Sequence, residues 1–502
     1  MQLSAEALIR MKGKDAAEHL TQKFPEKILQ FGTGVLLRAL PDYFIDKANK
    51  QGIFRGRVVV VKSTESDSSA FDRQNGLYTV CVRGIENGAA VSENILNSSI
   101  SRVLSAQSQW KEILDCASNP DIDIVLSNTT EVGIQLVNDD IHSAPPVSFP
   151  GKLLAFLYAR YKFFQGAPNK GMVIVPTELI TDNGSTLERI VLELAHRNQL
   201  EFAFIEWLEQ ANHFCNSLVD RIVPGKPAPD VKAELETALG YTDELLTMSE
   251  SFRLWAIEGD DAIRERLSFA AADSGMVIVP DITLFKELKL RLLNGTHTFN
   301  CGLAFLAGFR LTRDAVTHPL YSRLVRGLMH EEIAPAIPYP IDQEVKAAFA
   351  DSVMDRFCNP YVDHQWLSIT MQFTSKMKMR TLPLLLQHYK NAGAVPKRMA
   401  AGFAGYLLFM RSVQTPSGRF LGEWEGETYE IKDDSAAWLQ ELWAHRSANE
   451  VADAVLSSET LWDADLSALP GFADAVKRYL NDFQHKGVLE TIAELKNLSV
   501  TD

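Results

Sequence analysis

Three side chains in one predicted helix carry groups that suit the reduction of a carbonyl. Lys289 offers an ammonium, Asn294 a neutral amide and His297 an imidazole. At ~100° per residue these positions fall within roughly 140° of one another on an α-helix, so one broad face presents all three. Hydride that reaches a carbonyl carbon leaves negative charge on the oxygen, which must be hydrogen-bonded and then protonated. We therefore expect Lys289 to supply the proton, Asn294 to donate to the oxygen and His297 to orient a neighbouring hydroxyl.

The same helix has a plainer interpretation. Lysine and leucine alternate along residues 284–293, as on a solvated helix surface, and His297 would then be a histidine whose hydrogen bonds are satisfied within the protein. The catalytic interpretation adds a requirement, because a lysine that exchanges protons near neutral pH needs a pKa well below about 10.4. Burial and a nearby positive charge would both lower that pKa. Spacing alone leaves both interpretations open.

A glycine turn near the N-terminus predicts a dinucleotide site. Residues 28–39 run from an apolar strand through Gly32-Thr33-Gly34 into a helix. Glycine permits unusual dihedrals and lets backbone N–H groups approach a pyrophosphate, towards which a helix N-terminus directs partial positive charge. Leu37 occupies the place of the third glycine of a GxGxxG motif, so a purely structural turn is the alternative. The predicted cofactor contacts at the turn are Phe31, Gly32, Thr33, Gly34, Val35 and Arg38.

The end of the second predicted strand bears on the choice of cofactor. That strand, residues 57–61, runs into Lys62-Ser63-Thr64-Glu65. Glu65 or Asp67 could hold the ribose hydroxyls of NAD, whereas Lys62 with Ser63 could hold the 2′-phosphate of NADP. We predict NAD, with Glu65 at the ribose.

The elements around these motifs indicate an α/β protein. Apolar runs at residues 27–31, 57–61, 123–127, 172–175 and 276–279 alternate with helical stretches, which is typical of a mostly parallel sheet covered on both faces. After about residue 284 the strand signal fades, and residues 285–311, 398–411, 436–444 and 473–483 have the pattern of amphipathic or buried helices. We predict a Rossmann-like domain over residues 1–284 and a mainly helical substrate and catalytic domain over residues 285–502.

Composition limits the classes of partner. The chain has 502 residues and a formal net charge of -14, which argues against general affinity for nucleic acid or anionic membranes. The five cysteines are scattered with no CxxC spacing, so we expect neither a disulfide framework nor a zinc knuckle, and no metal. The N-terminus lacks the apolar core of a signal peptide, and the apolar runs are too short to span a membrane. We expect a cytoplasmic monomer or small homo-oligomer that binds a small molecule.

Several segments together resemble one family. The run from Lys289 to His297 resembles the K-x4-N-x2-H signature of the long-chain mannitol dehydrogenase family, and Gly32-Thr33-Gly34 with Arg38-Ala39 resembles its GxGxxxRA cofactor turn. Further similar segments, in the family's order, are Gly76-Leu77-Tyr78-Thr79, Asn216-Ser217-Leu218-Val219-Asp220-Arg221-Ile222 and Asn359-Pro360-Tyr361-Val362. The resemblance spans roughly residues 27–385. It implies a metal-independent transfer of hydride between NAD(H) and a sugar-derived substrate, and it favours the catalytic interpretation of Lys289.

Other segments resemble the uronate-reducing branch of that family. They are Ser127-Asn128-Thr129-Thr130-Glu131, Phe149-Pro150-Gly151-Lys152-Leu153 and Pro176-Thr177-Glu178-Leu179-Ile180 with Asn183-Gly184. The resemblance places Ser127, Asn128 and Thr129 at the cofactor, and for this branch the reaction would be reduction of D-tagaturonate to D-altronate by NADH in hexuronate catabolism. Polyol-oxidising members carry an Asp-Asn pair around Glu178-Leu179 whose asparagine holds the reacting oxygen; here Asn183 is the substitute we consider.

A uronate differs from a polyol by a carboxylate, so the site needs positive charge. Lys376, Lys378 and Arg380 are the predicted groups; an extended segment would direct all three to one side, whereas a helix would fan them apart, and a solvated basic patch is the alternative. Asp220 and His364 are predicted to bind substrate hydroxyls. The alternatives are that Asp220 pairs with Arg221 and that His364 is an ordinary surface histidine.

Other functions remain open. They are reduction of fructuronate or oxidation of mannitol or another polyol on the same scaffold, and a dinucleotide-binding sensor without turnover.

Overall fold

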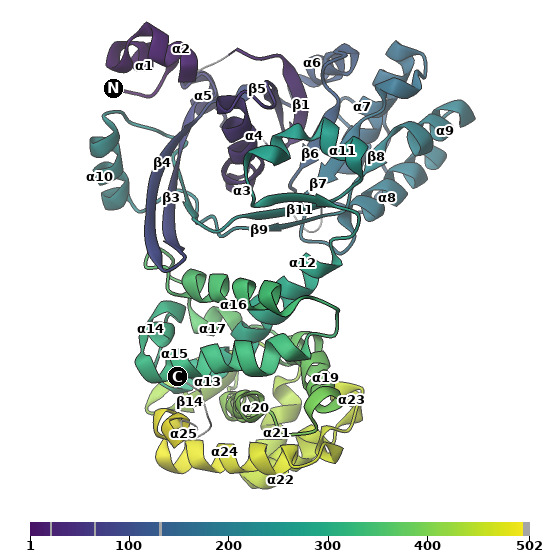
Figure 1. Cartoon of the computed structure of the whole chain (residues 1–502). Helices are drawn as coiled ribbons and strands as arrows, with labels where there is room; N and C mark the ends of the chain where they lie inside the picture. Colours follow the sequence, from purple (N-terminus) through teal and green to yellow (C-terminus); the bar gives the residue numbers. More distant parts are fainter. Residues whose placement is uncertain (21–22, 65–66, 130–132, 495–502) are drawn as a thin grey trace. The chain divides into compact units, whose positions relative to one another are not determined.

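The structure is a computed structural model that describes residues 1–20, 23–64, 67–129 and 133–494 (Figure 1). The chain divides into two compact units. Unit 1 comprises Met1–Gly84 and Ala90–Ile282, and unit 2 comprises Ile85–Ala89 and Thr283–Asp502.

A six-stranded parallel sheet forms the centre of unit 1. Its strand order is β5-β2-β1-β6-β7-β8, so the order reverses between β1 and β6. The strands are β1 (Glu26–Phe31), β2 (Arg57–Lys62), β5 (Ile100–Ser105), β6 (Ile124–Ser127), β7 (Val173–Pro176) and β8 (His213–Phe214). Ligands of such open parallel sheets bind at the carboxyl ends of the strands, beside the point of reversal. The glycine turn follows β1 at that point.

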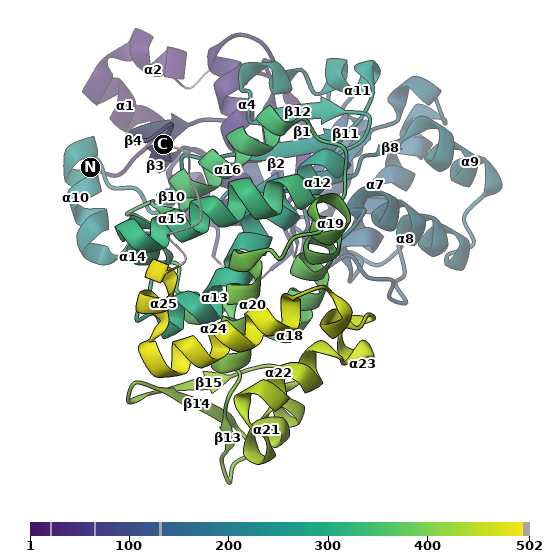
Figure 2. The same cartoon turned by 60° about the horizontal axis from the view of Figure 1, so that its bottom comes forward.

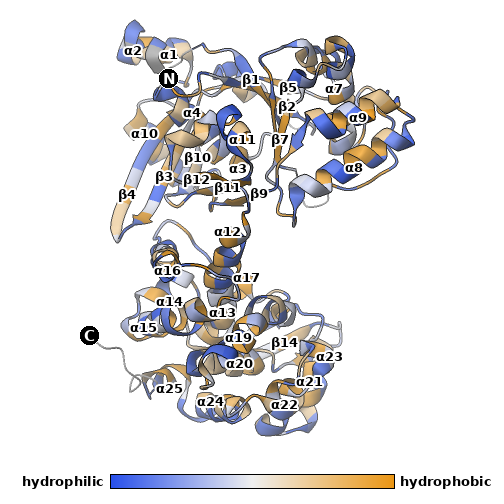
Figure 3. Ribbon diagram, turned by 45° about the vertical axis from the view of Figure 1, so that its right-hand side comes forward, coloured by the Kyte–Doolittle hydropathy of each residue, from blue (hydrophilic) through white to orange (hydrophobic). Residues whose placement is uncertain are grey.

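Alternate side chains of the central strands enter two different cores. Leu29 and Val59 belong to the core on one face of the sheet, and Ile28 and Val58 belong to the core on the other. Because both faces are buried, these strands are apolar throughout rather than alternating, as the orange colour of β2 and β7 in Figure 3 shows.

Helices of unit 1 cover the sheet and extend to its periphery. They are α1 (Ala5–Lys12), α2 (Lys14–Leu20), α3 (Val35–Ala39), α4 (Pro41–Lys50), α5 (Ser69–Arg73), α6 (Trp110–Asp115), α7 (Phe149–Phe164), α8 (Asn183–Arg197), α9 (Phe202–Ala211), α10 (Pro229–Leu239) and α11 (Asp261–Arg266). Apolar residues of α6, α7, α8 and α9 fill one core, and α4 contributes to the other.

Two further sheets of unit 1 were not predicted. One has the order β10-β3-β4, with β3 (Tyr78–Glu86), β4 (Ala89–Asn97) and β10 (Thr247–Glu250). The other has the order β12-β11-β9, with β9 (Ser217–Asp220), β11 (Leu254–Glu258) and β12 (Met276–Val279). The strand expected at residues 276–279 therefore exists, but it pairs with β11 outside the central sheet.

Unit 2 is mainly helical. Its α-helices are α12 (Thr283–Leu288), α13 (Thr296–Leu306), α14 (Thr312–Thr317), α15 (Pro319–Gly327), α16 (Gln343–Phe357), α17 (Trp366–Ile369), α18 (Phe373–Lys376), α19 (Leu382–Ala392), α20 (Lys397–Phe409), α21 (Ala436–His445), α22 (Ala448–Leu456), α23 (Glu459–Trp462), α24 (Phe472–Lys486) and α25 (Val488–Glu494). A small antiparallel sheet, β13 (Val413–Gln414), β14 (Phe420–Trp424) and β15 (Glu427–Ile431), was not predicted. The predicted fold class, an α/β domain followed by a mainly helical part, is confirmed.

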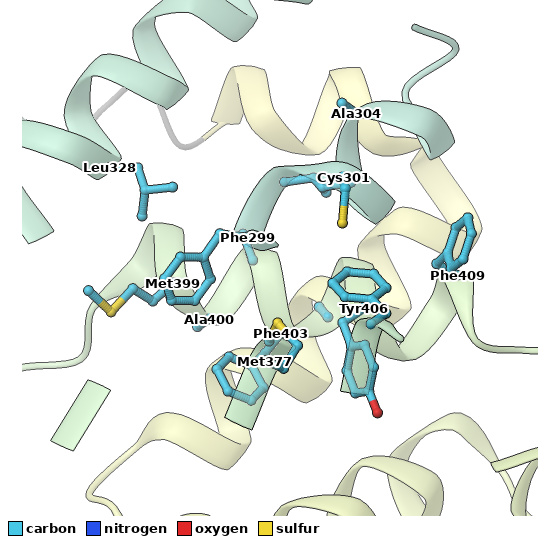
Figure 4. Close-up of a cluster of buried hydrophobic side chains, with 14 of the residues drawn as sticks. Phe299, Cys301, Ala304, Leu328, Met377, Met399, Ala400, Phe403, Tyr406 and Phe409 are labelled. Carbon is cyan, nitrogen blue, oxygen red and sulfur yellow. The ribbon is translucent and has the colours of Figure 1, made fainter. Parts of the chain in front are cut away.

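The core of unit 2 is built around α13 and α20. Helix α20 contacts α13 and α24, and all three can be followed in Figure 2. Glycine allows the close approach, because a Cβ atom on Gly402 would lie 2.8 Å from Cδ1 of Phe299. Figure 4 shows Phe299 beside Met399, Ala400 and Phe403 of α20. This packing fixes α13, the helix that carries His297.

No helix in the described part of the chain is long and apolar enough to cross a membrane.

Candidate active site

The turn after β1 depends on the absence of side chains. Gly32 has a φ of 124°, and a Cβ atom there would lie 2.9 Å from the carbonyl oxygen of Asn128. Gly34 is exposed, and a Cβ atom there would meet nothing within 4 Å. Gly32 therefore lets the turn pack against the segment after β6, and Gly34 leaves open space above the turn. This room fits the close approach of a dinucleotide.

The helix after the turn is short. Helix α3 ends at Ala39, and a new helix begins at Pro41 after a break at Leu40. The partial positive charge expected at the helix N-terminus therefore comes from a helix of only 5 residues. Phe31 and Arg38 point into the protein, where the Phe31 ring lies 5.1 Å from the Phe149 ring and Arg38 donates to the carbonyl oxygen of Leu245. Thr33 and Val35 are half-buried at the turn.

The segment after β6 lies against the turn and is tied to β7. Asn128 donates through Nδ2 to the Thr177 carbonyl oxygen at 3.2 Å, and Thr129 donates to the Glu178 carboxylate through its backbone N–H at 2.8 Å. Ser127 is buried and donates to the same carboxylate at 3.1 Å. Glu178 thereby holds the carboxyl ends of β6 and β7 together. The sequence motif contained Glu178 but gave no sign of this role.

The carboxyl end of β2 gives partial information on the ribose site. Lys62 is buried, and the exposed Asp67 carboxylate accepts from the backbone N–H of Ser69 at 2.8 Å. Glu65 lies outside the described residues.

The segment that carries Lys289 and Asn294 is a π-helix. It covers Lys289–Gly295 between α12 and α13. The α-helical geometry predicted for these residues is therefore wrong. Because a π-helix joins residue i to residue i+5, Lys289 and Asn294 lie about one turn apart instead of being offset by the roughly 140° of an α-helix. Lys289 and Asn294 are both half-buried.

Two more π-helical segments contact the first. They are η5 (Leu328–Ile333) and η7 (Met377–Thr381), which adjoins Lys376 and contains Arg380. Arg291 ties η4 (Lys289–Gly295) to η7, since its guanidinium donates at 3.0 Å to the carbonyl oxygens of both Met379 and Arg380. π-Helical turns occur frequently at functional sites. Nothing in the residue spacing had predicted them.

His297 is surrounded by three aromatic side chains. Its imidazole stacks on Phe357 with ring centroids 4.3 Å apart and meets His364 edge-on at 5.0 Å. Trp366 closes a third side at 6.0 Å. The side chain is buried, and Nε2 has no hydrogen-bond partner among the described residues. A buried nitrogen without a partner is a place for a ligand hydroxyl.

Electrostatics keep the His297 ring neutral. Burial, together with the neighbouring His364 and the cations Arg356, Arg380 and Lys376, holds the pKa of His297 well below its usual value. The charged groups with the largest effect on His297 are thus basic, in a chain whose net charge is -14. Arg356, which is buried, was missed by sequence reasoning because nothing about its position in α16 distinguishes it from a surface arginine.

The three predicted basic residues fan apart. They occupy a helical segment, so the extended alternative is wrong, and Lys378 leaves the group to pair with Asp463 at 2.8 Å. Lys376 and Arg380 are four residues apart and both act on His297. Two of the three residues therefore face the histidine.

Lys376 and Arg380 are partly shielded from water. Lys376 donates to the carbonyl oxygen of Ile369 at 2.8 Å, and Arg380 donates to Oγ1 of Thr298 at 3.4 Å. Burial lowers the pKa of both groups, and for Lys376 the nearby Arg380 adds to the effect. An anion would relieve the repulsion between two such cations.

The remaining predicted substrate residues have different environments. His364 is half-buried beside His297, and burial with the nearby Arg356 lowers its pKa. Asp220 is buried at the end of β9. Asn183 is buried, and its amide donates to the carbonyl oxygens of Pro176, Glu178 and Ser217. Asn183 thus holds the turn after β7 together.

Among the described residues, no three His, Cys, Asp or Glu side chains come together as a metal site.

Comparisons with known proteins agree with this architecture. Residues 26–270 match the mannitol dehydrogenase Rossmann domain, and residues 281–484 match the mannitol dehydrogenase C-terminal domain. A mannitol 2-dehydrogenase of Pseudomonas fluorescens, solved in a ternary complex with NAD and D-mannitol, is 22% identical with a TM-score of 0.66, over 99% of this chain and 100% of that one. A D-sorbitol dehydrogenase in substrate-free form is 21% identical with a TM-score of 0.76, over 93% of this chain and 95% of that one. These two structures share the fold.

Curated relatives are more similar in sequence. An altronate oxidoreductase of Bacillus subtilis (strain 168) is 39% identical over 487 residues, covering 96% of this chain and 97% of the relative. An altronate oxidoreductase of Cronobacter sakazakii is 40% identical over 483 residues, covering 94% of this chain and 97% of the relative. The resemblance expected from the sequence motifs is confirmed, and the chain belongs to the mannitol dehydrogenase family of oxidoreductases.

Proposed function

We propose that this protein reduces D-tagaturonate to D-altronate with NADH, reversibly, as a cytoplasmic enzyme of hexuronate catabolism. The family assignment makes the chain an oxidoreductase of a polyol or sugar acid that uses a nicotinamide dinucleotide. The observation that carries the narrower proposal is the set of basic groups around the neutral His297, because a neutral polyol offers no partner for them.

The carboxylate of the sugar acid is assigned to Lys376 and Arg380. Both cations are partly buried, and their pKa values are lowered, so an anion between them would gain charge-assisted hydrogen bonds. A ligand without the carboxylate would leave these cations unpaired, which costs more in a shielded site than in water. Lys378 is assigned no contact with substrate, because it pairs with Asp463.

Proton transfer is assigned to Lys289. The bound cofactor would supply hydride to the carbonyl carbon, and charge would then develop on the carbonyl oxygen. Asn294, about one π-helical turn away, is assigned the hydrogen bond to that oxygen, and Lys289 gives it a proton.

Substrate hydroxyls are assigned to His297, His364 and Asp220. His297 is neutral, and its Nε2 has no partner within the described part of the chain. This nitrogen can therefore either donate to or accept from a hydroxyl, depending on the tautomer. Phe357 and His364 pack against the imidazole of His297 and restrict the directions from which a hydroxyl can reach Nε2. This restriction would favour one arrangement of substrate hydroxyls.

The cofactor site is assigned to the turn of unit 1 and the segment after β6. Gly32 and Gly34 leave room for the pyrophosphate, and Asn128 and Thr129 border the turn. We assign NAD rather than NADP because Lys62 is buried, so its ammonium is poorly placed for a phosphate, and Glu65 remains the ribose partner.

A substrate panel tests the assignment. Oxidation of altronate, mannonate and mannitol is followed at steady state with NAD and with NADP. We expect kcat/KM to be highest for altronate with NAD. Faster turnover of mannonate would indicate a fructuronate reductase, faster turnover of mannitol would overturn the assigned role of the basic groups, and cofactor binding without turnover would indicate a sensor.

A further inference from the structure

Glu178 is a buried carboxylate at the carboxyl edge of the central sheet. It follows β7 by two residues, and its side chain is only 3% exposed. Oε1 accepts from the backbone N–H of Thr129 at 2.8 Å and from Thr129 Oγ1 at 3.0 Å, and Oε2 accepts from Ser127 Oγ at 3.1 Å. Both oxygens are therefore used as acceptors.

The described partners of Glu178 are all neutral. They are the backbone N–H groups of Thr129 and Glu178 and the hydroxyls of Thr129 and Ser127. Burial raises the pKa of Glu178, whereas the donors from Thr129 and Ser127 act in the opposite direction. Donors to both oxygens favour the ionised form. Burial of a charged carboxylate is costly, and buried ionisable groups with a shifted pKa are often found at functional sites.

Glu178 lies in the half of the sheet that meets the nicotinamide. A dinucleotide bound at a parallel sheet of this kind spans the reversal of strand order, with one mononucleotide on each side. The reversal lies between β1 and β6, and the ribose contacts that distinguish NAD from NADP belong to the β2 side. The nicotinamide half then falls on the side of β6 and β7, where Glu178 holds the segment that packs on Gly32.

We propose that Glu178 is ionised and that its charge favours the oxidised, cationic nicotinamide over the neutral reduced form. Glu178 is a positioning residue, because it also holds Thr129 and Ser127 beside the cofactor turn. The inference rests on the nicotinamide cofactor of the proposed function and not on the identity of the sugar acid.

The test is direct binding of NAD+ and NADH to the substrate-free, full-length protein. Glu178→Gln keeps the size of the side chain and removes its charge. We expect the Kd for NAD+ to rise about tenfold or more and the Kd for NADH to change less than about twofold, because a negative charge in a shielded site acts strongly on a cationic ring and little on a neutral one. Ser127→Ala is the matched control, since it removes a hydrogen bond and keeps the charge; both Kd values should then shift by the same factor.

The ratio of the two Kd values decides the outcome. An equal shift of both in Glu178→Gln would give Glu178 a structural role only, and unchanged values would remove its role altogether; either result overturns the inference. If Glu178→Gln does not fold, Glu178→Met is measured in the same way, because it is also uncharged and fills the buried space. Failure of the wild-type protein to bind either dinucleotide would instead overturn the proposed function, so the two failures are distinguishable.

Discussion

The glycine turn of unit 1 and the His297 cluster of unit 2 are built in opposite ways. The turn works through missing side chains, since Gly32 allows a backbone contact and Gly34 leaves open space. The cluster consists of polar and charged side chains that are buried or partly buried, and its His297 lies on α13, two residues after a π-helical segment. A turn made of backbone has little effect on the stability of the fold. Shielded cations, and an imidazole whose Nε2 has no partner among the described residues, instead destabilise the folded state until a ligand binds.

Replacing Lys289 should have the largest effect of the changes considered. General acid catalysis contributes about 10²–10⁴-fold to turnover, so Lys289→Ala should lower kcat by that order. Cofactor binding should be retained, because the turn belongs to unit 1 and Lys289 to unit 2. Steady-state kinetics and a separate titration with NADH measure the two quantities. Near-normal turnover would remove the assigned role, and a lost cofactor affinity would weaken the contrast between the two sites.

A matched pair of glycine substitutions tests the turn. In Gly32→Ala the new Cβ would meet the Asn128 backbone at 2.9 Å, at a φ of 124° that L-residues rarely adopt. We expect a loss of unfolding free energy of about 1–3 kcal/mol, measured by urea denaturation. In Gly34→Ala the Cβ meets nothing within 4 Å, so the stability should stay near that of the wild type while the Kd for the dinucleotide rises. Equal losses of stability in both variants would contradict the division of labour between the two glycines.

The two sites also differed in how far the sequence predicted them. The turn was predicted well because glycine at 32 and 34, after an apolar strand, has a direct conformational meaning. The six-residue strand before it and the apolar β2 followed from the same local pattern. The sequence also named Lys289, Asn294 and His297 as one set.

Other features of unit 2 could not be predicted. The π-helical turns change the angle between neighbouring residues, and no local pattern of residue types predicts them. The approach of Arg356 and Phe357 to His297 depends on contacts between α16 and distant elements, which spacing within one helix cannot reveal. For the same reason the separate sheet that contains β12 was not predicted, since the composition of a strand does not determine which strand it pairs with.

The basic residues of unit 2 offer a second matched pair. Arg380→Met removes a partly buried cation that acts on His297, and Lys378→Met removes a cation that pairs with Asp463. A charge-assisted hydrogen bond contributes about 1.5–3 kcal/mol, so Arg380→Met should lower kcat/KM for altronate by roughly 10–150-fold. Lys378→Met should change it less than about threefold, because an exposed ion pair contributes little. Equal effects in both variants would show that the cluster acts only through overall charge.

The smallest expected effect is the contribution of His297 to the pH dependence of the unfolding free energy. The folded-state pKa of His297 lies well below that of the unfolded chain, which is about 6.5. Below pH 6.5 the unfolded chain therefore binds a proton that the folded protein rejects, and the unfolding free energy falls as the pH falls, by at most about 1.4 kcal/mol for each pH unit until the lowered pKa is reached. His297→Phe keeps a ring on Phe357 but cannot titrate, so its curve between pH 6.5 and 5 should be flatter than that of the wild type. Gly34→Ala, which alters only the backbone-built site, should retain the wild-type slope. Urea denaturation at a series of pH values measures the unfolding free energy of all three proteins. Parallel curves for His297→Phe and the wild type would mean that burial of His297 does not lower the stability of the fold at acidic pH.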